Sequence, residues 1–156
     1  MQTSSDTNGE RIQVGQLEVI FFAKKRDTDG HADVFEIRIP PGAKVPGAHH
    51  HVGVDETLIG IEGVMTYVVG EQVYEIGPGQ RAFSPRGIVH YFLNRTDKPA
   101  RALAIATPAE LGPEYFRDAA AVLAAAAGGP PDMQKLFEVM RRYGVEPAKL
   151  PESVRL

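Results

Sequence analysis

The chain of 156 residues contains no cysteine and only five histidines. Without cysteine it can form neither a disulfide framework nor a thiolate metal site, which suits a reducing compartment. An excess of positive charge is also missing, because 17 Lys and Arg stand against 20 Asp and Glu and give a net charge of -3. We therefore expect no nucleic-acid partner, since a phosphate backbone is bound by a basic surface.

Long apolar runs are absent as well. The longest ones, such as Ala119 to Ala127, fall well short of the roughly 18 apolar residues that a membrane-spanning helix needs. The first ten residues are polar and lack the charged segment and apolar run of a signal peptide. These features predict a cytoplasmic protein with no membrane partner and a flexible N-terminus over residues 1–12.

The few histidines are concentrated around one carboxylate, in the pattern His49-x-His51-x4-Glu56, and His90 follows further along the chain. His49 and His51 are two residues apart, so both side chains would lie on one face of an extended strand. The spacing would allow three neighbouring strands to direct these four side chains at one point. Three imidazoles and a carboxylate are typical ligands of a mononuclear transition-metal centre.

A solvated loop that binds metal only adventitiously is the alternative interpretation of the run His49-His50-His51. The presence of Glu56 and His90 at suitable positions argues against it. His50 would point away from its neighbours and is expected at the surface or behind the ligands. His31 lies in a polar stretch and is interpreted as a loop residue.

Glycines and prolines surround these side chains at fixed spacings, which can be read as two motifs. The first is Gly42-x6-His49-x-His51-x4-Glu56-x6-Gly63, and the second is Gly79-x5-Pro85-x-Gly87-x2-His90-x3-Asn94. They resemble the two signature motifs of the cupin superfamily, and the chain is similar to small, quercetin-dioxygenase-like proteins of the cupin_2 type. The first motif has one extra residue before His49, within the loop that follows Gly42.

Several expectations about the site follow. The ligand set His49, His51, Glu56 and His90 predicts one divalent transition metal per chain, with iron or manganese favoured and nickel, copper, cobalt or zinc possible. Resemblance to cupin dioxygenases that cleave flavonols implies that Glu56 is both a ligand and a catalytic base. Asn94 is expected to be a structural residue that makes hydrogen bonds in a turn.

The pattern of short strands and turn residues from about Leu17 to Ala106 predicts a mainly β fold, the double-sheet jelly roll of cupins, over residues 13–108. Residues 109–156 form a C-terminal helical extension. One helix would run from Pro113 to about Ala126, and Asp132 would cap a second helix that ends near Gly144. We expect both helices to pack on the barrel or on a partner subunit, as a lid or a dimer contact, rather than to form a helix-turn-helix.

The predicted function is a metal-dependent, dioxygenase-like oxidoreductase that acts on a small aromatic or polyphenolic molecule. Leu58 and Phe92 would form an apolar wall beside the metal, although both could simply fill the core. Few cations adjoin the ligands apart from Arg81 and Arg86, which disfavours a sugar phosphate. The alternatives are a non-catalytic cupin that binds or senses a small molecule, and a metal-dependent isomerase, cyclase or lyase. Exposed apolar helix faces and analogy with cupins predict a homodimer.

Overall fold

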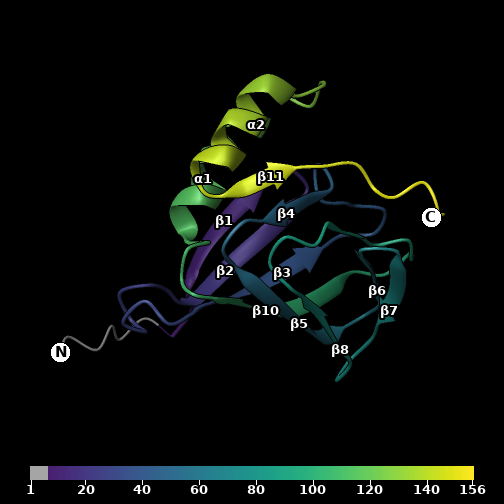
Figure 1. Ribbon diagram of the computed structural model, residues 1–156, viewed down its shortest axis with the longest axis horizontal. Helices are drawn as coiled ribbons and strands as arrows, with labels where there is room; N and C mark the ends of the chain where they lie inside the picture. Colours follow the sequence, from purple (N-terminus) through teal and green to yellow (C-terminus); the bar gives the residue numbers. More distant parts are fainter. Residues whose placement is uncertain (1–6) are drawn as a thin grey trace.

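The computed structural model describes residues 7–156, which fold into two antiparallel sheets with two helices at one end (Figure 1). The six-stranded sheet has the order β1-β2-β3-β10-β5-β8, and the five-stranded sheet has the order β11-β4-β9-β6-β7. The strands of the first sheet are β1 (Glu10–Val14), β2 (Leu17–Ala23), β3 (Asp33–Ile39), β10 (Ala100–Thr107), β5 (Asp55–Glu62) and β8 (Arg81–Ser84). Those of the second are β11 (Val145–Pro147), β4 (His49–His51), β9 (His90–Leu93), β6 (Met65–Val69) and β7 (Gln72–Ile76).

This arrangement is the expected mainly β jelly roll. In its central part the chain passes back and forth between the two sheets: β4, β6, β7 and β9 belong to the smaller sheet, whereas β5, β8 and β10 belong to the larger one. Folding one sheet over the other lets the two inner faces share a core and shortens the exposed edges.

The inner face of each sheet is built by residues that alternate along the strands. On β10, Ala102, Ala104 and Ala106 are completely buried, whereas the residues between them are only partly buried. Phe35 and Leu58 fill the same core from β3 and β5. The small alanine side chains on β10 leave room for these larger side chains between the sheets.

One glycine of the first motif is required by the backbone. Gly63 lies in the turn between β5 and β6 with a φ of +64°. A Cβ atom at this position would lie 2.2 Å from the carbonyl oxygen of Pro99, which is closer than any side chain tolerates. The motif glycine therefore allows the β5–β6 turn to pass directly against the start of β10.

Both helices form where the sequence predicts them. Helix α1 (Pro113–Ala125) begins at a proline, which fits the first turn of a helix because its missing N–H would have no partner there. Helix α2 (Met133–Arg142) begins after Asp132, whose side chain accepts a hydrogen bond from the backbone N–H of Lys135. Gly144 follows with a φ of +71°, as expected of a residue that ends a helix.

Two strands lie outside the stretch from Leu17 to Ala106 in which strands were predicted. Strand β1 occupies Glu10–Val14 and so begins inside the segment 1–12 predicted to be flexible; residues 1–6 of that segment lie outside the described part of the chain. Strand β11 pairs antiparallel with β4, with Val145 opposite His51 and Pro147 opposite His49. The C-terminal extension therefore supplies an edge strand to the barrel as well as the two helices.

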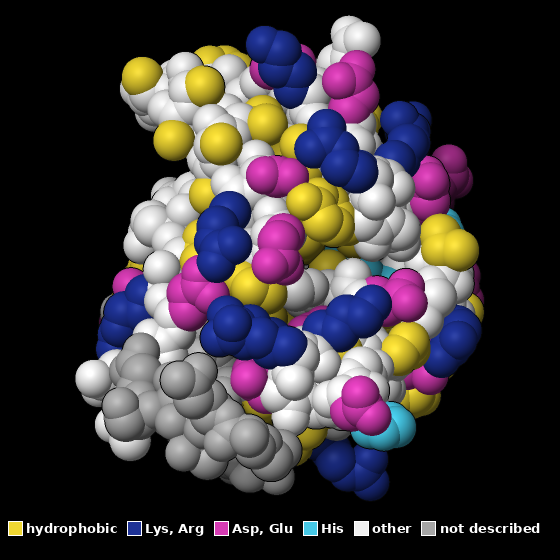
Figure 2. Space-filling model, turned by 90° about the vertical axis from the view of Figure 1, so that its left-hand side faces the viewer, with side chains coloured by type: hydrophobic (Ala, Val, Ile, Leu, Met, Phe, Trp, Pro, Cys, Tyr) yellow, Lys and Arg dark blue, Asp and Glu magenta, His cyan; other side chains and the backbone are white. Residues whose placement is uncertain are grey.

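The described helices are all too short or too polar to cross a membrane. On the face drawn in Figure 2, Lys and Arg side chains alternate with Asp and Glu and do not form a patch of one sign. Several charges of the described chain are paired, for example Lys24 with Glu10 and Arg142 with Asp118. Neither sign of charge dominates the face that Figure 2 draws.

Candidate metal centre

Three histidines and one glutamate meet between the two sheets. His49 and His51 lie on β4, and His49 is directly opposite His90 on the neighbouring strand β9. Glu56 lies on β5, which belongs to the opposite sheet, so the four side chains do not come from three neighbouring strands as expected. Instead the carboxylate approaches the three imidazoles from across the barrel.

The three histidines are close enough to share one ion. One nitrogen from each of His49, His51 and His90 lies within 4.8 Å of the other two, and all three side chains are buried. The ring centroids of His49 and His90 are 4.5 Å apart, and that of His51 lies 5.2 Å from His49 and 5.0 Å from His90. Three imidazoles at this separation are a ligand set for a divalent transition metal.

Hydrogen bonds orient two of these rings. Nδ1 of His49 is 2.9 Å from the carbonyl oxygen of Gly47, which can only accept, so Nδ1 carries the proton and donates it. Nδ1 of His90 lies 3.0 Å from the hydroxyl of Ser84 and 3.2 Å from the carbonyl oxygen of Ile88. In both rings Nε2 then remains unprotonated and available as a metal ligand, which is the usual effect of a partner behind a ligating histidine.

The glutamate lies against two of the imidazoles. Its Oε2 atom is 3.1 Å from Nε2 of His51 and 3.6 Å from Nε2 of His90. Burial disfavours the charged carboxylate, but the hydrogen bond from His51 and the nearby histidines outweigh this effect and lower the pKa of Glu56 to about 2. Glu56 is therefore ionised at neutral pH and can accept a proton or contribute an oxygen ligand.

Two features of the cluster fit a bound cation. Nε2 of His90 is buried without a hydrogen-bonding partner among the described residues, although buried nitrogens are normally satisfied. Burial, together with the charges of the neighbouring histidines, lowers the pKa of His49 well below its ordinary value, and burial also lowers the pKa of His90. Both rings are thus neutral, as metal ligation requires.

The cluster forms one end of a cavity of about 70 Å³. The remaining walls are almost entirely apolar and come mainly from the large sheet and the helical extension. The large sheet contributes Val14, Leu17, Val19, Phe35 and Ile37, the loop before β4 contributes Val45, Pro46 and Gly47, and β9 of the small sheet contributes Phe92. From the extension come Leu111, Tyr115, Phe116, Ala119, Leu136 and Met140.

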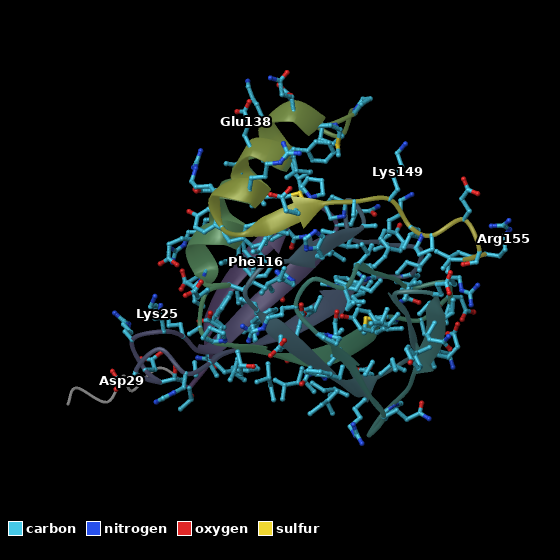
Figure 3. All side chains as sticks on the ribbon, in the orientation of Figure 1. Lys25, Asp29, Phe116, Glu138, Lys149 and Arg155 are labelled. Carbon is cyan, nitrogen blue, oxygen red and sulfur yellow. The ribbon has the colours of Figure 1, made fainter. Side chains whose placement is uncertain are left out.

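Helix α1 is held against the barrel by aromatic side chains. Phe116, which is labelled in Figure 3, projects from α1 towards the strands. Its ring centroid lies 5.6 Å from that of Phe21 and 5.2 Å from that of Phe35, in edge-to-face geometry at both contacts. The helices therefore cover the cavity, and part of their apolar surface packs on the barrel. The homodimer itself remains a prediction.

Other residues singled out in the sequence are distributed as follows. Phe92 lines the cavity, whereas Leu58 is completely buried in the core and is not part of the lining. The side-chain amide of Asn94 donates hydrogen bonds to the carbonyl oxygens of Ile39 and Lys98, which confirms its structural role. His50 lies outside the three-histidine cluster and is only partly buried.

Several residues beside the cluster could not be identified from the sequence. Ser84 contacts His90 from β8, and it could have been suspected only from its place just before Pro85 of the second motif. The hydroxyl of Tyr67 is buried without a hydrogen-bonding partner in the described structure, and the ring lies 6.0 Å from that of His90. Tyr115 and Phe116 fit the apolar face of α1, and nothing in their spacing indicates that they line the site.

Comparison with known proteins adds three structural relatives. A predicted oxalate decarboxylase from Thermotoga maritima is 23% identical, with a TM-score of 0.59, covering 69% of this chain and 99% of that one. A sugar phosphate isomerase of the cupin superfamily from Silicibacter pomeroyi is 26% identical, with a TM-score of 0.57 and coverage of 69% and 75%. The polyketide cyclase RemF from Streptomyces resistomycificus is 23% identical, with a TM-score of 0.57 and coverage of 69% and 79%.

These relatives have different activities, and the identities below 25% indicate a shared fold alone. A search of curated proteins finds no significant match. The family model Cupin_2, described as a cupin domain, matches residues 35–106, the stretch that runs from β3 to β10 and includes all four side chains of the cluster. This match shows that residues 35–106 form a cupin domain, and the jelly roll described above agrees with it.

Proposed function

We propose that this protein is a metal-dependent oxidoreductase of the dioxygenase type, which acts on a small, mainly apolar aromatic molecule. The observation that carries the proposal is the position of His49, His51, Glu56 and His90 at one end of a cavity whose other walls are apolar. A divalent iron or manganese ion held by these four residues would supply a Lewis acid and a redox centre with positions left open for small oxygen-containing ligands.

The residues around the cluster have separate tasks in this proposal. The ionised carboxylate of Glu56 accepts a proton from a substrate hydroxyl, because its oxygen lies beside the cluster and its low pKa keeps it available as an acceptor. A carboxylate with a pKa of about 2 is a weak base, so the transfer requires that the substrate hydroxyl also become more acidic on binding. The apolar walls exclude water, which strengthens the interaction between charges at the cluster.

The lining also disfavours a sugar phosphate, which is the substrate named for one of the relatives. No lysine or arginine among the described residues lines the cavity, so a sugar phosphate would bury its negative charge without a cationic partner other than the ion. Arg86 is paired with Asp55 outside the cavity, and Arg81 is exposed. A substrate with few polar groups suits these walls better than the substrate named for the isomerase.

The size of the cavity requires a movement of the lid. An engineered cavity of about 150 Å³ is large enough for benzene, whereas the cavity measures about 70 Å³. An aromatic substrate therefore enters only when α1 and α2 move outward from the barrel, as lids do in many enzymes. The four residues Gly128-Gly129-Pro130-Pro131 between the helices, and the exposed positions around them, leave the tip of the lid free to shift.

The proposal is tested by measuring metal content and oxygen consumption on the same preparations. Wild-type protein purified without chelator is compared with the double variant His49→Ala, His51→Ala and with the matched control His50→Ala. Iron or manganese near one per chain in the wild type and the control, lost in the double variant, would support the site. Oxygen uptake with a panel of phenols and catechols, abolished in the double variant, would support the reaction.

Other outcomes would redirect or refute the proposal. Stoichiometric zinc without oxygen uptake would refute the oxidative reaction and leave the oxygen-independent isomerase, cyclase or lyase as the explanation. Protein that contains no metal and takes up none on reconstitution would refute a metal enzyme and favour a cupin that only binds or senses a small molecule. Equal metal content in the wild type and the double variant would refute the ligand assignment itself.

A further inference from the structure

The cavity contains a second polar position apart from the metal centre. Among its lining residues, Tyr115 is the only polar side chain other than the three histidines and Glu56. It lies on α1, the helix that covers the cavity, next to Phe116, whose ring centroid is 5.0 Å away. The other described residues of the lining are apolar, so a molecule in the cavity meets polar side chains only at Tyr115 and at the cluster.

The hydroxyl of Tyr115 has no hydrogen-bonding partner within the described chain, in contrast to Tyr143 on the neighbouring helix end. Tyr143 packs against the Tyr115 ring at a centroid distance of 5.7 Å and donates its own hydrogen bond to Asp118. Burial, and to a lesser extent the negative charge of Glu56, raises the pKa of Tyr115 well above its ordinary value. The hydroxyl is therefore protonated and can donate a hydrogen bond.

A tyrosine hydroxyl that lines an apolar cavity and makes no hydrogen bond to the protein is free to donate to, or accept from, a bound molecule. Its position in the lining means that a ligand can supply the missing partner. We propose that the Tyr115 hydroxyl binds an oxygen of the substrate, and that the substrate is an uncharged, mainly apolar molecule with a hydroxyl or carbonyl group at each of two ends. This inference rests on the proposed function, since the other polar end of the substrate lies at the His49, His51 and His90 cluster.

The placement of Tyr115 on α1 also links recognition to closure of the lid. A substrate that contacts Tyr115 completes its hydrogen bond only when α1 lies against the barrel. A molecule of the same shape without the oxygen would fill the apolar walls equally well but would leave the hydroxyl unsatisfied. Polar groups in a closed site distinguish between two such molecules much better than apolar walls do.

The experiment compares phenol and toluene, which differ by a hydroxyl in place of a methyl group. Their dissociation constants are measured by calorimetry on the full chain, in metal-free and cobalt-loaded protein, for the wild type and for Tyr115→Phe. The control is Tyr143→Phe, which removes a hydroxyl from the adjacent ring without changing the cavity lining. Metal content and melting temperature are recorded for every preparation.

We expect Tyr115→Phe to weaken the binding of phenol about fivefold, the effect of losing one neutral hydrogen bond. Toluene binding and metal content should stay unchanged, and Tyr143→Phe should bind both probes like the wild type. A variant that weakens both probes equally would mean that Tyr115 only packs the lid. Equal binding of phenol by wild type and variant, or no binding of either probe to the wild type, would overturn the inference.

Failure of this inference is distinguishable from failure of the proposed function. The metal-free protein retains Tyr115 and the apolar walls, so the phenol and toluene comparison does not depend on a bound ion. If the chain takes up no metal but Tyr115→Phe still weakens phenol selectively, the metal enzyme is refuted and the binding role of Tyr115 stands. If metal and oxygen uptake are found but phenol binding is the same in the wild type and in Tyr115→Phe, the metal enzyme stands and the binding role of Tyr115 is refuted.

Discussion

Phe116 offers a direct measure of how firmly the helical lid is attached to the barrel. Its ring packs against Phe21 and Phe35 with centroid distances of 5.6 and 5.2 Å. Removing a fully buried phenylalanine costs about 3–5 kcal/mol. Phe116 is only partly buried and one side already borders the cavity, so we expect Phe116→Ala to lower the free energy of unfolding by about 3 kcal/mol, the lower end of that range.

A loss of this size corresponds to a melting temperature lower by about 6–12 °C for a chain of this length. The assay is urea and thermal unfolding of metal-free protein, and the control is Phe22→Ala. Phe22 is the neighbour of Phe21 but is 51% exposed, so its loss should cost no more than about 0.5 kcal/mol. The larger cavity of Phe116→Ala should also bind benzene more tightly than the wild type does, and benzene should stabilise the variant more.

The packing described for α1 would be refuted by a Phe116→Ala variant that loses less than about 1 kcal/mol or no more than the Phe22→Ala control. Benzene that stabilises the variant no more than the wild type would show instead that removing Phe116 does not enlarge the cavity. Either result would also remove the reason for assigning the helices to the site, because the apolar walls of the cavity depend on them.

Four further predictions concern the cluster and the extension. His90→Ala should abolish stoichiometric metal binding with an unchanged far-UV circular dichroism spectrum, and full metal occupancy in this variant would exclude His90 as a ligand. Glu56→Gln should keep much of the metal but lose turnover, whereas normal turnover would remove Glu56 from proton transfer. Burial lowers the pKa of His49 and His90 in the folded chain, so the unfolded chain binds more protons below about pH 6.5. The free energy of unfolding of metal-free protein should then fall with decreasing pH by up to about 1.4 kcal/mol per pH unit for each histidine, and a flat profile between pH 6.5 and 5 would contradict this. Asp132→Ala removes the cap of α2 and should cost about 1 kcal/mol in urea unfolding, more than Asp97→Ala in an exposed loop.

The ligand positions and the barrel could be predicted because their signals are local. His49 and His51 lie two residues apart on a strand, and the turns at Gly63 and Pro85 are encoded by residues with unusual backbone preferences. The caps of α2 at Asp132 and Gly144 are local in the same way. Each of these features depends on a few consecutive residues and is visible in the sequence.

The parts that were missed depend on contacts between distant residues. Strand β11 is too short to show an alternating pattern, and it exists because Val145 and Pro147 pair with the β4 strand. The assignment of Glu56 to the opposite sheet follows from the pairing of β5 with β10 and β8, which no single segment encodes. Leu58 lies at a position on β5 where the alternation of side chains predicts that it points inward. Core residues and cavity walls both occupy inward positions, so the alternation could not distinguish between them.

The sequence by itself determined the cupin domain, the β barrel, the helices and the four side chains of the cluster, because spacing and backbone preference act over short distances. Only the tertiary structure decided what surrounds that cluster. The same apolar face of α1 could have packed on a partner subunit, and its burial against Phe21 and Phe35 is what closes the cavity and brings Tyr115 into it. Which apolar surfaces meet is a property of the whole fold, since hydrophobic burial has no direction and no sequence spacing of its own.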